Sequence, residues 1–226
     1  DKVYFVLEGY PQFRLKLDEH YKSDRKRPDE SFLKQKRAII DLVKKHMPFV
    51  SVRHAEFECD DVIATLTAIH ARKGDECTIV SSDSDFIQLH NAFDIQLYNP
   101  VKKSFVEKPD YDYVVWKALR GDPTDNILGI KGIGDKTAHK LVRDPGMLKE
   151  LLQDENKRAI FERNVNLIRL VDLSQRIDEM EFDFGKYSFD FLYEAFDKFE
   201  FSSMLKEKTW NKYCETFQGL QVTGFN

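Results

Sequence analysis

Carboxylates fall into four short groups, each of which could help to bind a divalent cation. The groups are Glu8, the run Glu58 to Asp61 with Asp60 inside it, the pair Asp83 and Asp85, and the pair Asp122 and Asp125. Hard cations such as Mg²⁺ and Mn²⁺ take oxygen ligands of this kind. Two such ions about 4 Å apart can activate water and stabilise the leaving oxygen in phosphodiester hydrolysis. No His- or Cys-rich spacing offers a competing zinc site.

Each group has a simpler explanation when it is taken alone. A carboxylate at position 60 or 61 could cap a helix, and the pair at 83 and 85 could belong to a turn. The pair at 122 and 125 could serve a proline-containing turn. Carboxylates that converge on one place repel one another unless cations neutralise them. Convergence in the fold would therefore favour the metal site over these simpler explanations.

The elements that must position the carboxylates alternate along the first half of the chain. Apolar runs predict strands at Val3–Leu7, Phe49–Val52, Cys77–Val80, Asp94–Tyr98 and Ser104–Val106. Helical periodicity predicts helices at Ser31–His46 and Asp60–Arg72, and a short helix at Phe86–His90. This alternation predicts an α/β fold with a mostly parallel sheet flanked by helices. Its carboxyl edge would bring Glu8 together with Asp83 and Asp85.

The pattern becomes mostly helical from about residue 110. Helices are predicted at Tyr113–Leu119, Lys136–Val142, Gly146–Gln153 and Phe189–Lys198. We therefore expect an α/β core over residues 1–109 and a helical subdomain over residues 110–226.

A glycine-rich run, Gly129 to Ala138 (GIKGIGDKTA), is the most specific motif in the chain. Its closely spaced glycines predict a helix–hairpin–helix whose backbone amides and helix dipole suit a phosphate. Such a hairpin binds the backbone of a duplex without reading its bases. The predicted contacts are Gly129, Lys131, Gly132, Gly134, Lys136 and Thr137. A plain glycine-rich connection between helices is the alternative, whereas the spacing of a nucleotide P-loop is absent.

The charge balance is compatible with a nucleic-acid binder although the net charge is −4. Lys and Arg are dense from Arg14 to Lys45, and the acidic residues gather in the groups described above. An acidic site that binds metal cations, together with basic segments that bind phosphate, would give a net charge of this size. The sequence shows no membrane-spanning apolar run and no signal-peptide pattern. The three cysteines lack metal-ligand spacing and indicate free thiols in a reducing compartment.

Five segments, in order along nearly the whole chain, resemble motifs of the 5′-nuclease superfamily of flap endonucleases, 5′→3′ exonucleases and RNase H type enzymes. FRLKLDEHYKSDR resembles "FR…YKxxR", and EFECDDVIATL resembles "xEADDxxAxL" with Cys59 in the usual Ala position. SSDSDFIQL resembles "(S/T)xDxDxxQL", and GDPTDNILGIKGIGDKTAHKL resembles "GDxxDNxxGxxGIGxKTAxxL". DKFEFSSMLKE resembles "xxLEFxSLLxE". The resemblance implies a PIN-like core followed by a helix–hairpin–helix subdomain.

The resemblance also implies roles for individual residues. Two Mg²⁺ or Mn²⁺ ions would be held by Asp83, Asp85, Asp122 and Asp125, with Glu8 as a further candidate. Glu58, Asp60 and Asp61 would be metal ligands or carboxylates that support the ligands. Asp122 and Asp125 would hold the more weakly bound ion. Tyr21, Lys22 and Arg25 would be catalytic, with Lys22 nearest the scissile phosphate, at the base of a helical arch over about residues 14–47. Arg14 would assist in DNA binding, and a potassium ion would bind at the hairpin.

Two departures from the family pattern bear on the completeness of the site. The family begins with a central strand that ends in a metal-binding Asp, some tens of residues before Val3, and we expect this segment to be missing from the chain. Glu8 stands where the family usually has Asp, so its side chain is one methylene longer. These departures leave Glu8 as the weakest of the predicted ligands.

We expect a monomeric, cytoplasmic enzyme of a bacterium or of a phage-infected host. It would cut DNA with 5′ flaps, nicks or single-stranded 5′ ends, and RNA–DNA hybrids, during replication, repair and Okazaki fragment processing. One alternative is a branched-DNA binding module that is inactive because the first ligand is missing. A PIN-like ribonuclease and a nuclease domain of a polymerase are the others, and a stand-alone phage-type nuclease is preferred to the latter.

Overall fold

A computed structural model describes residues 1–185 and 187–220 of the protein. The chain forms two compact units whose segments interleave along the sequence. Unit 1 comprises residues 1–9, 26–55 and 178–226, and unit 2 comprises residues 10–25 and 56–177. The boundary expected near residue 110 stays a prediction. No helix within the described part of the chain is long and apolar enough to cross a membrane.

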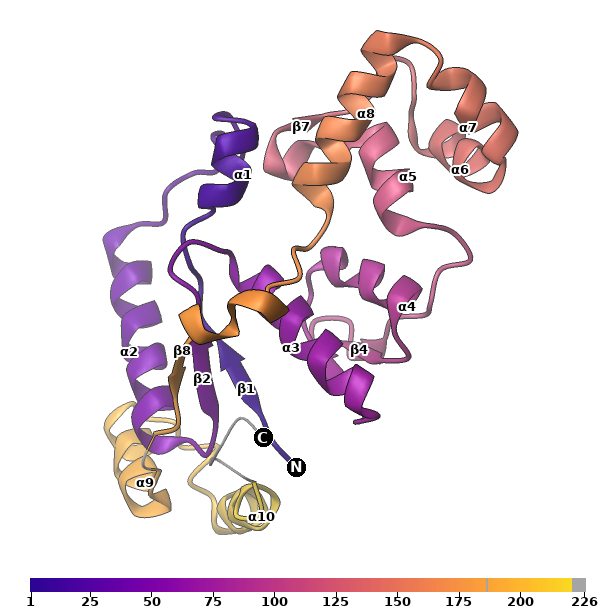
Figure 1. The fold of residues 1–226 in the computed structure, drawn as a ribbon. Helices are drawn as coiled ribbons and strands as arrows, with labels where there is room; N and C mark the ends of the chain where they lie inside the picture. The colour runs from indigo at the N-terminus through magenta and orange to yellow at the C-terminus, as the bar shows by residue number, and fades with distance from the viewer. Residues whose placement is uncertain (186, 221–226) are drawn as a thin grey trace. The chain divides into compact units, whose positions relative to one another are not determined.

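Unit 1 contains a three-stranded sheet in which β2 (Val50–Arg53) lies between β1 (Tyr4–Val6) and β8 (Glu181–Asp183) (Figure 1). The pair β1–β2 is parallel and the pair β2–β8 is antiparallel. Helix α2 (Glu30–His46) begins where the Asp29 side chain accepts a hydrogen bond from the Phe32 amide, which is a standard N-cap. The helices α9 (Phe189–Lys198) and α10 (Glu207–Phe217) complete the unit.

The core of unit 1 is aromatic. Leu192 and Phe196 of α9 are buried against Leu42 of α2, and Trp210 and Tyr213 of α10 pack onto them. The α9 prediction is confirmed at both ends, whereas α10 and β8 were not predicted. β8 is only three residues long, and only its middle residue, Phe182, is part-buried, so its own pattern gave no strand signal.

Unit 2 contains a second three-stranded sheet with the order β3-β4-β5, formed by Thr78–Val80, Gln96–Asn99 and Ser104–Phe105. The pair β3–β4 is parallel and β5 is an antiparallel edge strand. Helix α3 (Cys59–Lys73) ends at Gly74, whose φ of 87° is left-handed. The 3-10 helix η1 (Ser84–Gln88) and the short α4 (Leu89–Ala92) follow β3.

The α/β class is confirmed, but the strands do not form the one sheet that the alternation suggested. Within the described residues, β1 and β3 belong to separate sheets. Glu8 follows β1 in unit 1, whereas Asp83 and Asp85 follow β3 in unit 2. The shared sheet edge for these three carboxylates therefore stays a prediction.

The rest of unit 2 is largely helical. It comprises α1 (Gln12–Leu17), α5 (Tyr113–Arg120), α6 (Asp135–Arg143), α7 (Pro145–Leu151), α8 (Glu155–Ile168) and the short elements β6 (Gly121–Asp122), η2 (Pro123–Asp125), β7 (Ile127–Leu128) and η3 (Ser174–Glu179). The buried Asn164 of α8 donates to the carbonyls of Ala118 and Leu128, at 2.9 and 2.8 Å. This amide fastens α8 to both α5 and the loop before the glycine hairpin.

Two glycines allow α5 and the hairpin to approach backbone to backbone. Gly121 has a φ of 82°, and a Cβ added there would lie 2.3 Å from the Gly129 nitrogen. A Cβ added at Gly129 would lie 2.1 Å from the Arg120 carbonyl oxygen. By contrast, a Cβ at Gly134 would meet nothing within 4 Å. Gly129 is therefore required for packing, whatever its part in binding.

Replacing Gly129 with alanine should lower the free energy of unfolding by about 2–4 kcal/mol, because the new methyl group would overlap backbone atoms that cannot move independently. Urea denaturation followed by circular dichroism measures this change. Gly134→Ala is the matched control and should change stability by less than about 1 kcal/mol. Equal effects of the two substitutions would contradict the packing role of Gly129.

Candidate metal and nucleic-acid site

The buried guanidinium of Arg14 is hydrogen-bonded to two carboxylates of unit 2. Arg14 on α1 is 3% exposed, and its Nη atoms donate to both carboxylate oxygens of Asp61, at 2.6 and 2.8 Å, and to Glu58 at 2.9 Å. Burial acts to lower the pKa of Arg14, but the hydrogen bond and charge of Asp61 outweigh it and leave that pKa above its usual value. Arg14 therefore stays charged and compensates two buried carboxylates.

This arrangement argues against two of the predicted roles. Arg14 was predicted to contact DNA, but its side chain is buried and its donors are engaged within the protein. Asp61 was predicted to bind metal or to support the ligands. It is fully buried, accepts two hydrogen bonds from Arg14 and accepts a third from the Val171 amide at 2.8 Å, which favours the supporting role. We assign Asp61 to the support of the site rather than to its metal ligands.

The segment 167–173, which leaves α8, is held by side chains from three elements. Arg14 donates to the carbonyls of Leu167 and Arg169, at 2.8 and 3.2 Å. The Thr65 hydroxyl of α3 donates to the Asp61 carbonyl and accepts from the Leu173 amide, both at 2.8 Å. These bonds fix α1 and α3 to one extended strip of backbone.

Gln88 attaches the loop after β3 to the same strip. Its Nε2 donates to the carbonyls of Asp85 and Ile168, at 2.9 and 3.2 Å, and its Oε1 accepts from the Leu170 amide at 2.9 Å. The position of Asp85 is thus tied to the segment that also holds Arg14 and Asp61. The sequence singled out Gln88 only as one residue of a family motif, and two of its three backbone partners, Ile168 and Leu170, lie 80 or more positions away.

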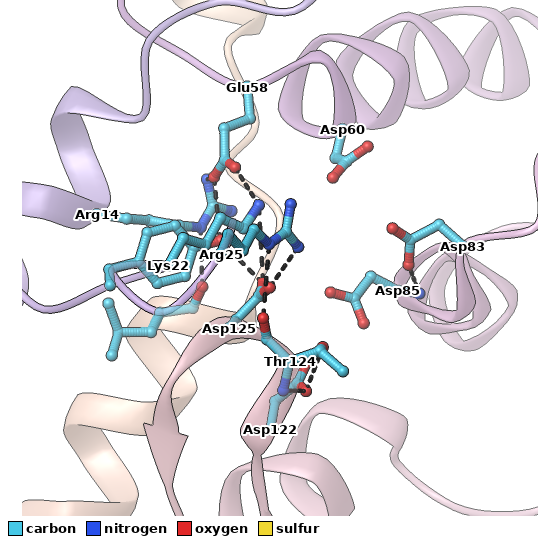
Figure 2. Close-up of polar contacts among 12 residues, drawn as sticks. Arg14, Lys22, Arg25, Glu58, Asp60, Asp83, Asp85, Asp122, Thr124 and Asp125 are labelled. Carbon is cyan, nitrogen blue, oxygen red and sulfur yellow. Dashed lines mark hydrogen bonds and ion pairs between the residues drawn. The ribbon is translucent and has the colours of Figure 1, made fainter. Parts of the chain in front are cut away.

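Three carboxylates of unit 2 form a group with the spacing of a metal site. Asp85, Asp122 and Asp125 each offer an oxygen within 4.8 Å of the others. A small pocket in the same unit is lined by Glu58, Asp60 and all three of them. Figure 2 shows Asp60, Asp83 and Asp85 pointing into a common space. The chemistry of this donor set fits a hard divalent cation, which prefers carboxylate oxygens.

The members of this group differ in their surroundings. Burial raises the pKa of Asp85, with the charge and hydrogen bond of Lys117 acting against it. Burial alone would also raise the pKa of Asp122, but hydrogen bonds from Lys117 and Thr124 hold that pKa below its usual value. Asp83 is exposed, and its side chain accepts a hydrogen bond from the Asp85 amide at 2.9 Å. Asp83 therefore shapes the loop on which Asp85 sits.

Basic side chains from the turn after α1 reach the same carboxylates. Lys22 pairs with Glu58 and lies 3.7 Å from Asp125, and Arg25 pairs with Asp125 (Figure 2). Lys22 has a φ of 56°, which is uncommon for a residue other than glycine. The backbone bond from its amide to the Asp125 carbonyl, at 3.0 Å, secures that conformation.

Tyr21 lies between two carboxylates. Its hydroxyl is 3.2 Å from Glu58 and 3.2 Å from Asp125. Burial and the charges of these neighbours raise the pKa of Tyr21 far above its usual range. The phenol therefore stays protonated and acts as a hydrogen-bond donor at this site.

Lys117 is the residue of this site that the sequence analysis missed. It is 7% exposed and pairs with Asp85 and, at 2.6 Å, with Asp122. Burial acts to lower the pKa of Lys117, but the charge of Asp85 outweighs it and raises that pKa. Its position offered a signal, because it is the one charged residue in the apolar run YVVWKAL of α5.

The glycine hairpin connects β7 to α6. Ile130 is buried and donates its amide to the Leu119 carbonyl at 2.9 Å, and Gly132 has a φ of 84°. Gly134 is the N-cap of α6. Because glycine has no side chain, the first amides of the helix receive no capping hydrogen bond from it. Lys131, Lys136 and Thr137 are exposed beside them. The loop thus presents amides and positive charge to solvent, as an anion site requires.

Arg14→Met should lower the free energy of unfolding by about 3–5 kcal/mol, because it leaves the buried Asp61 carboxylate without its charged partner. Urea denaturation provides the measurement. Arg72→Met is the control, since Arg72 and Asp172 form an exposed pair that should contribute less than about 1 kcal/mol. If both substitutions had the same small effect, the supporting role of Arg14 would be refuted.

Comparisons with known proteins identify the family of the chain. Residues 1–117 match the family model described as 5′-3′ exonuclease, N-terminal resolvase-like domain, and residues 109–186 match 5′-3′ exonuclease, C-terminal SAM fold. The thermostable DNA polymerase I of Thermus thermophilus is 32% identical over 228 residues, covering 92% of this chain and 27% of that protein. DNA polymerase I of Deinococcus radiodurans is 32% identical over 192 residues, covering 76% of this chain and 20% of that protein.

Solved structures show the same fold at lower identity. The D15 protein of T5, crystallised with metal ions, has a TM-score of 0.63 and 18% identity, over 99% of this chain and 86% of that one. The bacteriophage T5 D15 flap endonuclease in complex with DNA and metal ions has a TM-score of 0.62 and 18% identity, over 96% of this chain and 83% of that one. The chain spans about a quarter of the length of the curated polymerases that it matches.

Proposed function

Because the chain belongs to the 5′-3′ exonuclease family, we propose that it is a structure-specific, divalent-metal-dependent 5′-nuclease. Its substrates would be DNA with 5′ flaps, nicks or single-stranded 5′ ends, and RNA–DNA hybrids, as arise in replication, repair and Okazaki fragment processing. The observation that carries the proposal is the convergence of Asp85, Asp122 and Asp125 beside the basic turn of Lys22 and Arg25.

The acidic residues supply the metal-binding part of this proposal. Asp85, Asp122 and Asp125 would hold a Mg²⁺ or Mn²⁺ ion, and Glu58, Asp60 and Asp83 would contribute to a second ion. Glu8 stays a weaker candidate. A bound divalent cation supplies Lewis acidity toward the phosphate and toward water.

The chain's own cations and donors would bind and orient the substrate. Lys22 and Arg25, which neutralise Glu58 and Asp125 in the free protein, would offer their charge to the scissile phosphate as negative charge develops there. The Tyr21 hydroxyl would hold Glu58 and Asp125 in place. An arch over about residues 14–47 would admit the single-stranded 5′ end.

The hairpin would hold the duplex part of the substrate. Exposed amides at the start of α6, with Lys131 and Lys136, would contact phosphates, and a potassium ion at the hairpin would strengthen this grip. Contacts of this type fix register without reading bases. Specificity would then follow the shape of the substrate and not its sequence.

Cleavage of a labelled 5′-flap substrate tests the proposed chemistry. The full-length protein should release product with Mg²⁺ and none in EDTA, and Asp85→Asn or Asp122→Asn should slow release by at least about 100-fold, because each removes a negative ligand oxygen. Glu150→Gln, at an exposed position on α7, should cleave normally. Flap binding in EDTA without any Mg²⁺-dependent product would identify a binding module instead, and a preference for RNA over DNA flaps would identify a ribonuclease.

Substitution of the hairpin lysines tests duplex binding. Lys131→Met and Lys136→Met should each weaken binding equally for unrelated sequences and reduce the slope of log K against log salt by about 0.9, because each removes one phosphate contact. Fluorescence anisotropy at several salt concentrations measures both effects. Lys73→Met, at an exposed position at the end of α3, should leave the slope unchanged. A hairpin variant with the wild-type slope would rule out that lysine as a phosphate contact.

A further inference from the structure

Lys117 occupies an unusual position for a lysine, within the acidic group that carries the proposed metal site. Its ammonium pairs with Asp85 and lies 2.6 Å from Asp122, and its side chain is 7% exposed. Asp85 and Asp122 are two of the three carboxylates that lie within 4.8 Å of one another. A single buried ammonium therefore pairs with two of the three carboxylates in the free protein.

The surroundings of Lys117 keep the ammonium at this place. The lysine lies on α5, whose neighbouring residues Ala118 and Leu119 are fully buried. Its nitrogen is also 5.9 Å from the centre of the Tyr113 ring, which favours a cation over its face. Asp122 is held from the other side by Thr124, whose amide and hydroxyl donate to Oδ1 at 2.9 and 2.6 Å. Lys117 thus pairs with carboxylates that are themselves fixed.

We infer that Lys117 is a built-in counter-cation that lowers the affinity of the Asp85–Asp122–Asp125 group for a divalent ion. This inference rests on the proposed metal site. An incoming cation must share Asp85 and Asp122 with a positive charge that is already there, and the two cations repel at close range in a poorly solvated site. The ion at this position would therefore bind weakly in the free protein.

The same charge has a consequence for the order of binding. A nucleic-acid phosphate brings negative charge that Lys117 can meet once a metal ion takes its place on the carboxylates. Metal and phosphate would then bind cooperatively at this position, whereas the metal alone would bind poorly. Lys117 would act as a specificity-determining residue, because it couples occupation of the site to the presence of substrate.

Mn²⁺ binding in the absence of nucleic acid tests the inference. Lys117→Met should bind Mn²⁺ about tenfold more tightly than the wild type, which corresponds to about 1.4 kcal/mol. Electron paramagnetic resonance of free Mn²⁺ measures the affinity, and Asp122→Asn in each background assigns the change to this group. Lys149→Met, at an exposed position on α7, is the control and should bind like the wild type.

Thermal unfolding adds a second measurement. Lys117→Met should unfold at a lower temperature than the wild type in EDTA, because Asp85 and Asp122 then repel each other, and Mn²⁺ should raise its Tm more than that of the wild type. Lys117→Gln keeps hydrogen-bond donors without the charge and tests the same expectation if the Met variant does not fold. Lys117→Arg keeps the charge and should retain weak Mn²⁺ binding.

The outcomes separate the inference from the proposed function. If the wild type binds Mn²⁺ and the neutral variants bind it equally or more weakly, the counter-cation role is refuted and the metal site stands. If neither the wild type nor any variant binds Mn²⁺ at millimolar concentration, the metal site and the inference both fail. Tighter binding by both neutral variants, lost on adding Asp122→Asn, supports the inference.

Discussion

The buried Arg14 guanidinium is the contact on which the site in unit 2 depends. It neutralises Asp61 and Glu58 and also binds carbonyls of the strip 167–173. Breaking such a buried pair leaves an uncompensated charge, which costs far more than the loss of a surface ion pair. The side chains of Thr65 and Gln88 are hydrogen-bonded to the same strip. Loss of Arg14 would therefore also disturb α3 and the loop of Asp85, which are attached to that strip.

Charge compensation explains why so many carboxylates can lie together in the free protein. Four of the carboxylates that line the pocket have a basic partner: Lys22 pairs with Glu58, Arg25 with Asp125, and Lys117 with Asp85 and Asp122. These pairs are also the groups that a metal ion or a phosphate would rearrange. Basic side chains thus offset part of the negative charge of the free site, and ligand binding would exchange one set of pairs for another.

The hairpin depends on a different constraint, which is steric. Gly121 and Gly129 let two backbone segments meet at distances that no Cβ could share, and Asn164 fixes both segments to α8. Lys131 in the hairpin and Lys136 at the start of α6 are exposed. Backbone packing therefore explains why residue 129 is a glycine, whereas the side chains of Lys131 and Lys136 are exposed and can contact a ligand.

The sequence by itself determined the α/β class, the bounds of helices such as α9, the glycine hairpin and the family motifs, because short-range periodicity and spacing encode them. It did not separate Asp61 from Asp85, since both are acidic residues in quoted motifs. Only the tertiary structure decided that Asp61 is buried against Arg14 while Asp85 joins Asp122 and Asp125. It also revealed the pairing of Lys117 with Asp85 and the contacts of Gln88 with Ile168 and Leu170, because these partners lie 32 or more positions apart and local patterns carry no record of such contacts.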